Sequence, residues 1–111
     1  MMSAGNQTIK FELFRQFKVN EDDLKLLCLK MGVRSLAVFG SVIHGDFKMG
    51  QSDIDFLVEF EIVSADRFFD FLDGLKELFH YDKIDLVTMS SLKNQGIRQT
   101  ILSSQKNIYA A

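Results

Sequence analysis

The spacing of apolar side chains along the chain predicts a succession of helices and strands. From position 21 to position 31 apolar residues recur every three or four positions, as on one face of a helix. Asn20 suits the N-cap of this helix, the acidic run that follows favours its positive end, and Gly32 suits its end. The next segment, residues 33–39, is a short and mostly apolar run that stops at Gly40, which is typical of a buried strand.

The second half of the chain continues this succession. Residues 53–60 alternate in polarity, which predicts a strand with one face in the core. Ser64 suits the N-cap of a helix over residues 65–79. The buried stripe of that helix is expected to consist of Phe68, Leu72, Leu75 and Phe79. A short helical turn, a third strand, a last helix and a terminal strand are predicted at residues 41–47, 83–89, 93–104 and 107–110.

This order of elements predicts an α/β (α+β) domain, with a small mixed β-sheet and helices packed mainly on one face. The chain has 111 residues, which suits one domain rather than two. We expect residues 20–111 to form the domain and residues 1–19 an N-terminal extension. Within the extension, residues 1–8 are expected to be loose, and residues 9–14 fit a strand and a helix equally well.

Composition narrows the choice of partners and compartment. Fifteen acidic against 13 basic residues give a net charge of −2, which argues against a nucleic-acid partner. The single cysteine, the lack of a signal-peptide pattern and the lack of a membrane-length apolar run indicate a cytoplasmic protein. Eleven phenylalanines are many for a small core, so Phe69 together with Phe11, Phe14 or Phe17 could mark a partner surface. The oligomeric state stays open, a homo-oligomer included.

Three aspartates carry the chemistry of the second half of the chain. Asp53 and Asp55 are one residue apart in a predicted strand, so both carboxylates would project from one face. Two carboxylates so close repel each other unless a cation neutralises them, and Mg²⁺ or Mn²⁺ prefers such oxygen ligands. Asp85 in the next strand is the best third carboxylate, whereas Asp82 is interpreted as a solvated turn residue.

A glycine–serine pair lies between a predicted strand and a helical turn. Gly40 would let the backbone approach a phosphate closely, and the Ser41 hydroxyl could donate to a phosphate oxygen. The Gly-Ser pair or the Asp-x-Asp pair alone is weak evidence for a nucleotide site, because Gly-Ser often forms a plain turn and Asp-x-Asp often starts a strand. Their combination at a fixed spacing arises by chance about once in ten thousand such chains.

The combination resembles the DNA polymerase beta-type nucleotidyltransferase superfamily. The sequences VFGS at 38–41 and SDIDFLV at 52–58 carry the resemblance, and KIDLV at 83–87 matches the strand with the third carboxylate. The chain is similar in length and in its ending to the minimal nucleotidyltransferase (MNT) domains, over about residues 20–110.

The resemblance implies that an acceptor hydroxyl attacks the α-phosphorus of a nucleoside triphosphate and that pyrophosphate leaves. It implies that Asp53, Asp55 and Asp85 are the catalytic residues and the ligands of two Mg²⁺ ions, with Mn²⁺ as the alternative. The residues implied to bind the nucleotide are Gly40, Ser41, His44 and Ser52. Many family members carry arginine shortly after Gly-Ser, whereas this chain has VIH at 42–44, so His44 would take the place of an arginine.

The MNT resemblance also suggests a substrate and a partner. Stand-alone MNT domains resemble the antitoxins of HEPN–MNT toxin–antitoxin pairs, which transfer AMP from ATP to a tyrosine of a helical HEPN toxin. Two alternatives remain open on the sequence. The domain could inhibit a helical partner by contact alone, without catalysis, or it could be the catalytic subunit of an aminoglycoside-type nucleotidyltransferase.

Overall fold

The computed structural model describes the backbone of residues 4–111 and the side chains of residues 8–111. In chain order the elements are α1 (Ala4–Phe17), α2 (Glu21–Met31), β1 (Val33–Phe39), α3 (Ser41–His44), β2 (Ile54–Phe60), α4 (Ala65–Phe79), β3 (Ile84–Val87), the 3-10 turn η1 (Met89–Ser91), α5 (Gln95–Ser104) and β4 (Lys106–Ala110). The predicted order of helices and strands after residue 20 is confirmed. No helix among the described residues is long and apolar enough to cross a membrane.

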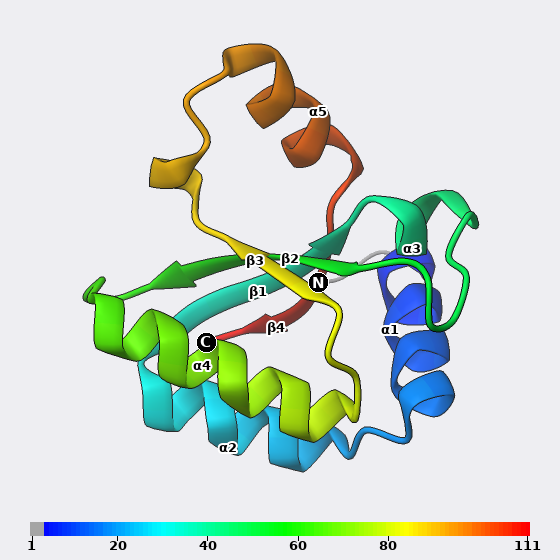
Figure 1. Cartoon of the computed structure of the whole chain (residues 1–111), viewed down its shortest axis with the longest axis horizontal. Helices are drawn as coiled ribbons and strands as arrows, with labels where there is room; N and C mark the ends of the chain where they lie inside the picture. The colour runs from blue at the N-terminus through cyan, green and yellow to red at the C-terminus, as the bar shows by residue number, and fades with distance from the viewer. Residues whose placement is uncertain (1–3) are drawn as a thin grey trace.

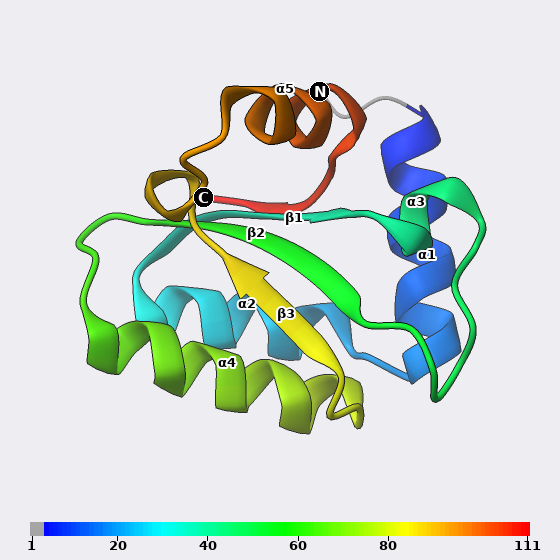
Figure 2. The same cartoon turned by 45° about the horizontal axis from the view of Figure 1, so that its top comes forward.

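The sheet has the strand order β3-β2-β1-β4 and is mixed, as predicted. The pairs β1–β2 and β1–β4 are antiparallel, whereas β2 and β3 run parallel. Helices α2 and α4 lie side by side under one face of the sheet, and α5 lies over the other face (Figures 1 and 2). The large core lies on the α2–α4 side, while a small cluster of Ala37, Leu57 and Ile101 lies under α5.

The caps that were predicted for two helices are present. The Asn20 side chain accepts hydrogen bonds from the amides at positions 22 and 23 at the start of α2. Gly32 ends α2 with φ 67°, a left-handed conformation that glycine adopts without steric cost. The Ser64 hydroxyl accepts a hydrogen bond from the Arg67 amide at the start of α4. These local signals therefore fix where the chain enters and leaves the two central helices.

The predicted buried stripe of α4 is only partly correct. Phe71, Leu75 and Phe79 are its fully buried residues, and Phe68 and Leu72 are half-buried at its margin. The buried side chains follow an i, i+4, i+8 row, which is the row that packs against the sheet and α2. A 3.6-residue period does not distinguish this row from its neighbour, so the pattern alone missed Phe71.

Residues 9–14, which fitted either a strand or a helix, belong to the helix α1. Leu13, Phe14 and Phe17 of α1 are buried, and both of these rings pack against Phe79 of α4. The expectation of a loose start is therefore wrong for residues 4–8, which are helical, while residues 1–3 lie outside the described residues. Helix formation gains stability here because the three apolar side chains share one face and reach the same core.

The suggestion that phenylalanines mark a partner surface is corrected for two of them. Phe14 and Phe17 are core residues, so neither ring projects from the surface towards a partner. Phe11 and Phe69 do project into solvent, with 78% and 60% of their surface exposed. The many phenylalanines are accommodated because several rings pack edge to face around Phe79, including Phe56 at 5.3 Å between centroids.

If α1 is an integral part of the core, Leu13→Ala should lower the free energy of unfolding by about 2–5 kcal/mol, because it leaves a cavity beneath the helix. Urea denaturation followed by circular dichroism measures this change. Phe11→Ala on the exposed face of α1 is the matched control and should change stability by less than about 0.5 kcal/mol. Equal stability of Leu13→Ala and the wild type would contradict the packing of α1.

Candidate active site

The parallel pairing of β2 with β3 brings two of the three predicted aspartates together. Asp55 and Asp85 are register partners in adjacent strands. Register partners in neighbouring strands project on the same face of the sheet, so the two carboxylates are neighbours. Asp53 is exposed and lies just before β2, which begins at Ile54 and not at position 53 as predicted. Asp53 is therefore next to the pair but outside the strand's hydrogen-bond ladder.

The pKa of Asp55 responds to its burial and to the other two carboxylates. The pKa of Asp55 is raised from its ordinary value of 3.8 to about 6. Burial of this half-buried side chain is the main cause, and the negative charges of Asp85 and Asp53 add to it. The three negative charges thus lie together at the end of the sheet where β2 and β3 begin, and a divalent cation would be attracted there.

Gly40 passes directly against this point. It follows the last residue of β1, Phe39, which is the register partner of Asp55 on the other side of β2. Its φ of 74° and ψ of −141° lie in a region that is essentially restricted to glycine. A Cβ on Gly40 would lie 2.2 Å from Oδ2 of Asp55, so a larger residue at this position would have to displace the Asp55 carboxylate. The glycine–serine pair and the aspartates, which are separate motifs in the sequence, therefore form one site.

Ser41 begins α3 immediately after this glycine. The short helix has hydrogen bonds from the amides of Ile43 and His44 to the Gly40 carbonyl, at 3.0 and 3.2 Å. It ends at Gly45, which has φ 76°. The helical turn predicted for residues 41–47 is thus confirmed over a shorter range. Ser41 is half-buried beside Gly40, whereas His44 is exposed at the far end of α3.

Ser52 shapes the loop that leads into Asp53. Its hydroxyl accepts a hydrogen bond from the Lys48 amide at 2.9 Å, and its own amide donates to the Lys48 carbonyl at 2.9 Å. This pair of bonds closes the loop between α3 and β2. In this hydrogen bond the Ser52 hydroxyl is an acceptor, so its proton is still free for donation to a phosphate oxygen. The role of Ser52 in nucleotide binding stays a prediction.

Tyr81 is the residue of this region that the sequence analysis missed. Its hydroxyl donates to the Ser52 carbonyl and accepts a hydrogen bond from the Gly50 amide. Its ring packs on Phe17 of α1 and on Phe47 after α3, with centroids 5.3 and 5.9 Å away. Tyr81 therefore ties the loop before Asp53 to the core. No periodicity indicated this, since Tyr81 lies in the short turn before β3.

The donor set suits a hard divalent cation. Carboxylate oxygens are the ligands that Mg²⁺ prefers, and Asp55 and Asp85 are already adjacent. Among the side chains of residues 8–111, no group of three His, Cys, Asp or Glu is arranged so that it could hold a metal ion. Asp53 is exposed and lies outside the strand, so its side chain can change rotamer at little cost. Asp55 and Asp85 therefore suit two ligands of an Mg²⁺ site, and Asp53 is the nearest further carboxylate.

Comparison with known proteins identifies the family to which the chain belongs. The sequence model of the nucleotidyltransferase domain family matches residues 22–107, which is most of the chain. The chain therefore belongs to the nucleotidyltransferase domain family and is a nucleotidyltransferase. The matched region contains Gly40, Ser41 and the three aspartates, and it begins after α1.

Individual relatives narrow the comparison further. The chain is 43% identical to the protein adenylyltransferase MntA of Thermococcus cleftensis, over 66% of this chain and 72% of that protein. It is 40% identical to a putative protein adenylyltransferase of Methanocaldococcus jannaschii, over 69% of this chain and 78% of that protein. These relatives confirm the predicted resemblance to the MNT group.

Solved structures support the same fold. A crystal structure of a toxin–antitoxin with AMP-PNP superposes with a TM-score of 0.64 at 20% identity, covering 84% of this chain and 75% of the other. A crystal structure of a mutant of the toxin–antitoxin MntA–HpeT superposes with a TM-score of 0.62 at 18% identity, with the same coverage. The predicted fold class is therefore confirmed.

The contact between Gly40 and Asp55 yields a matched pair of variants. Gly45→Ala has the same positive φ but nothing within 4 Å of the added methyl group, so it should cost only roughly 1–2 kcal/mol of stability. Gly40→Ala should also displace Asp55, and it should lower nucleotidyl transfer by about 100-fold, because misplacement of about 1 Å at a reacting centre has such an effect. Transfer rates of the two variants, compared at equal folded fractions, decide this. Equal losses in both would contradict the contact.

Asp55 should destabilise the metal-free fold at neutral pH. Its pKa in the fold is raised to about 6, above the ordinary 3.8 that applies when the chain is unfolded. The loss of folding stability caused by Asp55 is therefore absent below about pH 4. It grows as the pH rises from about 4 to about 6 and is complete above about pH 6. Asp55→Asn should thus raise Tm by a few degrees at pH 7.5 in EDTA and leave Tm unchanged at pH 3.5, as measured by calorimetry. A Tm gain of equal size at both pH values would contradict this origin.

Proposed function

We propose that this nucleotidyltransferase transfers AMP from ATP to a hydroxyl group of a partner protein and thereby acts as the antitoxin of a toxin–antitoxin pair. The observation that carries the proposal is the meeting of Asp55 with Asp85 across β2 and β3, with the backbone of Gly40 against the Asp55 carboxylate. Support for the protein acceptor comes from relatives that are named protein adenylyltransferases and from structural neighbours that are described as toxin–antitoxin structures.

The reaction follows from the roles that the side chains could take. The acceptor hydroxyl oxygen forms a bond to the α-phosphorus, the bond from that phosphorus to the bridging oxygen breaks, and pyrophosphate leaves with the electron pair. A carboxylate oxygen of Asp85 accepts the hydroxyl proton, since Asp85 is exposed to an incoming acceptor. The backbone of Gly40 and the Ser41 hydroxyl hold the terminal phosphates. His44, at the other end of α3, takes the place of the arginine that many family members carry after Gly-Ser.

Asp53, Asp55 and Asp85 would hold two Mg²⁺ ions, or Mn²⁺ in their place. When bound, these ions neutralise charge on the attacking and leaving oxygens. The raised pKa of Asp55 supports this assignment. Burial and the two neighbouring carboxylates disfavour the charged form of Asp55, and a bound cation would stabilise that form. The exposure of Asp53 and Asp85 supports a macromolecular acceptor, because a side chain of a second protein can reach the edge of the sheet. We assign that acceptor to a tyrosine of a HEPN-type helical toxin.

The test uses purified chain, ATP, Mg²⁺ and a purified HEPN-type toxin, for which the product of the gene next to this chain's gene is the first candidate. Intact-mass spectrometry should show AMP-sized additions to the toxin with the wild type. Asp53→Asn and Asp85→Asn should reduce the additions to background, because each removes a carboxylate from the site. Asp82→Asn is the matched control, since Asp82 is an exposed acidic residue close to Asp85 in the sequence, and it should transfer AMP at the wild-type rate.

The alternative function predicts a different outcome of the same experiment. A domain that inhibits by contact alone would silence the toxin without any change of mass, and Asp53→Asn would inhibit as well as the wild type does. That result would contradict the enzymatic proposal. Additions to a small aminoglycoside but not to the toxin would contradict the assignment of the acceptor.

A further inference from the structure

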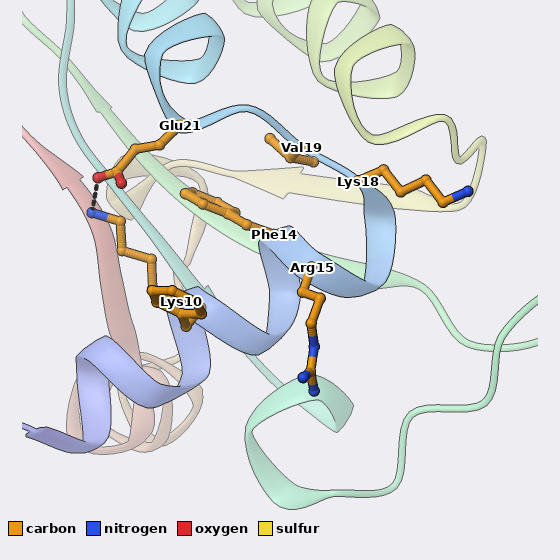
Figure 3. A pocket seen from close by; sticks show the side chains of 7 residues that line it. Lys10, Phe14, Arg15, Lys18, Val19 and Glu21 are labelled. Atoms are coloured by element: carbon orange, nitrogen blue, oxygen red, sulfur yellow. Dashed lines mark ion pairs between the residues drawn. The ribbon is translucent and has the colours of Figure 1, made fainter.

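A hollow of about 660 Å³ lies between α1 and the start of α2, away from the three aspartates. It is lined by Lys10, Phe11, Phe14, Arg15, Lys18, Val19 and Glu21 (Figure 3). Phe14 and Val19 are buried and form its apolar floor, whereas the Phe11 ring is 78% exposed. An exposed aromatic ring beside an apolar hollow loses its contact with water only when another molecule covers it.

The charges around this hollow are unbalanced. Lys10 forms an ion pair with Glu21, and the hydrogen bond from Lys10 holds the pKa of Glu21 below its ordinary value. Arg15 and Lys18 have no acidic partner within the described part of the chain. In Figure 3 these two side chains extend in different directions from the end of α1. The hollow is thus basic in a chain whose net charge is −2, and its occupant should be acidic.

A second hollow continues this surface beyond the Lys10–Glu21 pair. It is lined by both of these residues together with Lys25, Leu29, Ile108, Tyr109 and Ala110. Leu29 is 67% exposed, so it provides a second apolar contact next to another lysine. A strip that alternates exposed apolar side chains with cations is complementary to an amphipathic helix with acidic flanks.

This surface is mechanically connected to the active site. Phe17, on the buried side of α1, packs on Phe47 and Tyr81 with ring centroids 5.8 and 5.3 Å away. Tyr81 in turn holds the Gly50–Ser52 part of the loop that leads into Asp53. A partner that binds α1 would therefore contact the same helix that packs on Tyr81, and Tyr81 holds the loop before Asp53. The α1 part of this surface lies outside residues 22–107, the part that matches the family, whereas Lys25 and Leu29 of α2 lie inside it.

We propose that the two hollows along α1 and α2 form the docking surface for a protein that presents an acidic amphipathic helix. An apolar side chain of that helix packs between Phe11 and the Phe14–Val19 floor, and its carboxylates face Arg15 and Lys18. The inference rests on the proposed function in one respect, because the docked protein is taken to be the toxin that carries the acceptor hydroxyl. Docking on α1 then holds that hydroxyl near the edge of the sheet.

Binding of the same purified HEPN-type toxin to the immobilised chain tests the surface. The double variant Arg15→Glu/Lys18→Glu and the single variant Phe11→Ser should each raise Kd at least about tenfold, because each removes a contact of the occupant. The matched controls are Lys30→Glu/Lys93→Glu, with the same change of charge elsewhere, and Phe69→Ser, another exposed aromatic. Both controls should bind as the wild type does. All six changed residues are exposed on the surface, so the variants should fold.

The outcomes separate docking from catalysis. Asp53→Asn should bind the toxin normally and transfer no AMP, while the α1 variants should regain transfer at saturating toxin. Unchanged Kd in the α1 variants, or equal weakening in the controls, would overturn the docking proposal without affecting the proposed function. Normal docking on α1 with no AMP transfer by the wild type would instead contradict the proposed function alone. A wild-type dimer that Arg15→Glu/Lys18→Glu converts to monomer would show that the occupant is a second copy, which also overturns the proposal.

Discussion

The close approach of the Gly40 backbone to the Asp55 carboxylate is the contact on which the site depends. Asp55 lies in the middle of three strands, with Phe39 opposite it in β1 and Asp85 opposite it in β3. The chain leaving β1 has to turn across the end of β2 to begin α3, and only a residue without Cβ can do so at this distance. Because of this turn, the start of α3 and the carboxylates face the same space.

A partly buried carboxylate next to two others is an unfavourable arrangement, and the rest of the fold has to hold it in place. The core under β2 does so with side chains that are completely buried, among them Ile54 and Phe56 on either side of Asp55. Edge-to-face packing of Phe56 with Phe79 anchors the strand on α4. Stability is thus concentrated in the apolar layer directly beneath the charged edge, which is a common way in which functional strain is supported.

Helix α1 extends this support beyond the region that matches the nucleotidyltransferase family. Phe17 connects the helix to Tyr81, and Tyr81 holds the loop before Asp53 through two hydrogen bonds. The other side of the same helix is exposed and basic. An element outside the matched region therefore helps to position the loop before Asp53, and it also carries the surface on which we place the partner.

The sequence by itself determined most of the local elements after residue 20 and which residues are candidates for the site. Caps such as Asn20, Gly32 and Ser64 act within a few residues, and alternation around Asp55 predicts a strand regardless of its neighbours. Tertiary structure decided what no local window contains: that β3 pairs with β2 so that Asp85 meets Asp55, and that Tyr81 supports the loop. It also decided that residues 9–14 are helical and that Phe71 rather than Phe68 is fully buried. The physical reason is that strand order, and the choice between two faces of similar polarity, depend on packing between segments that are distant in the chain.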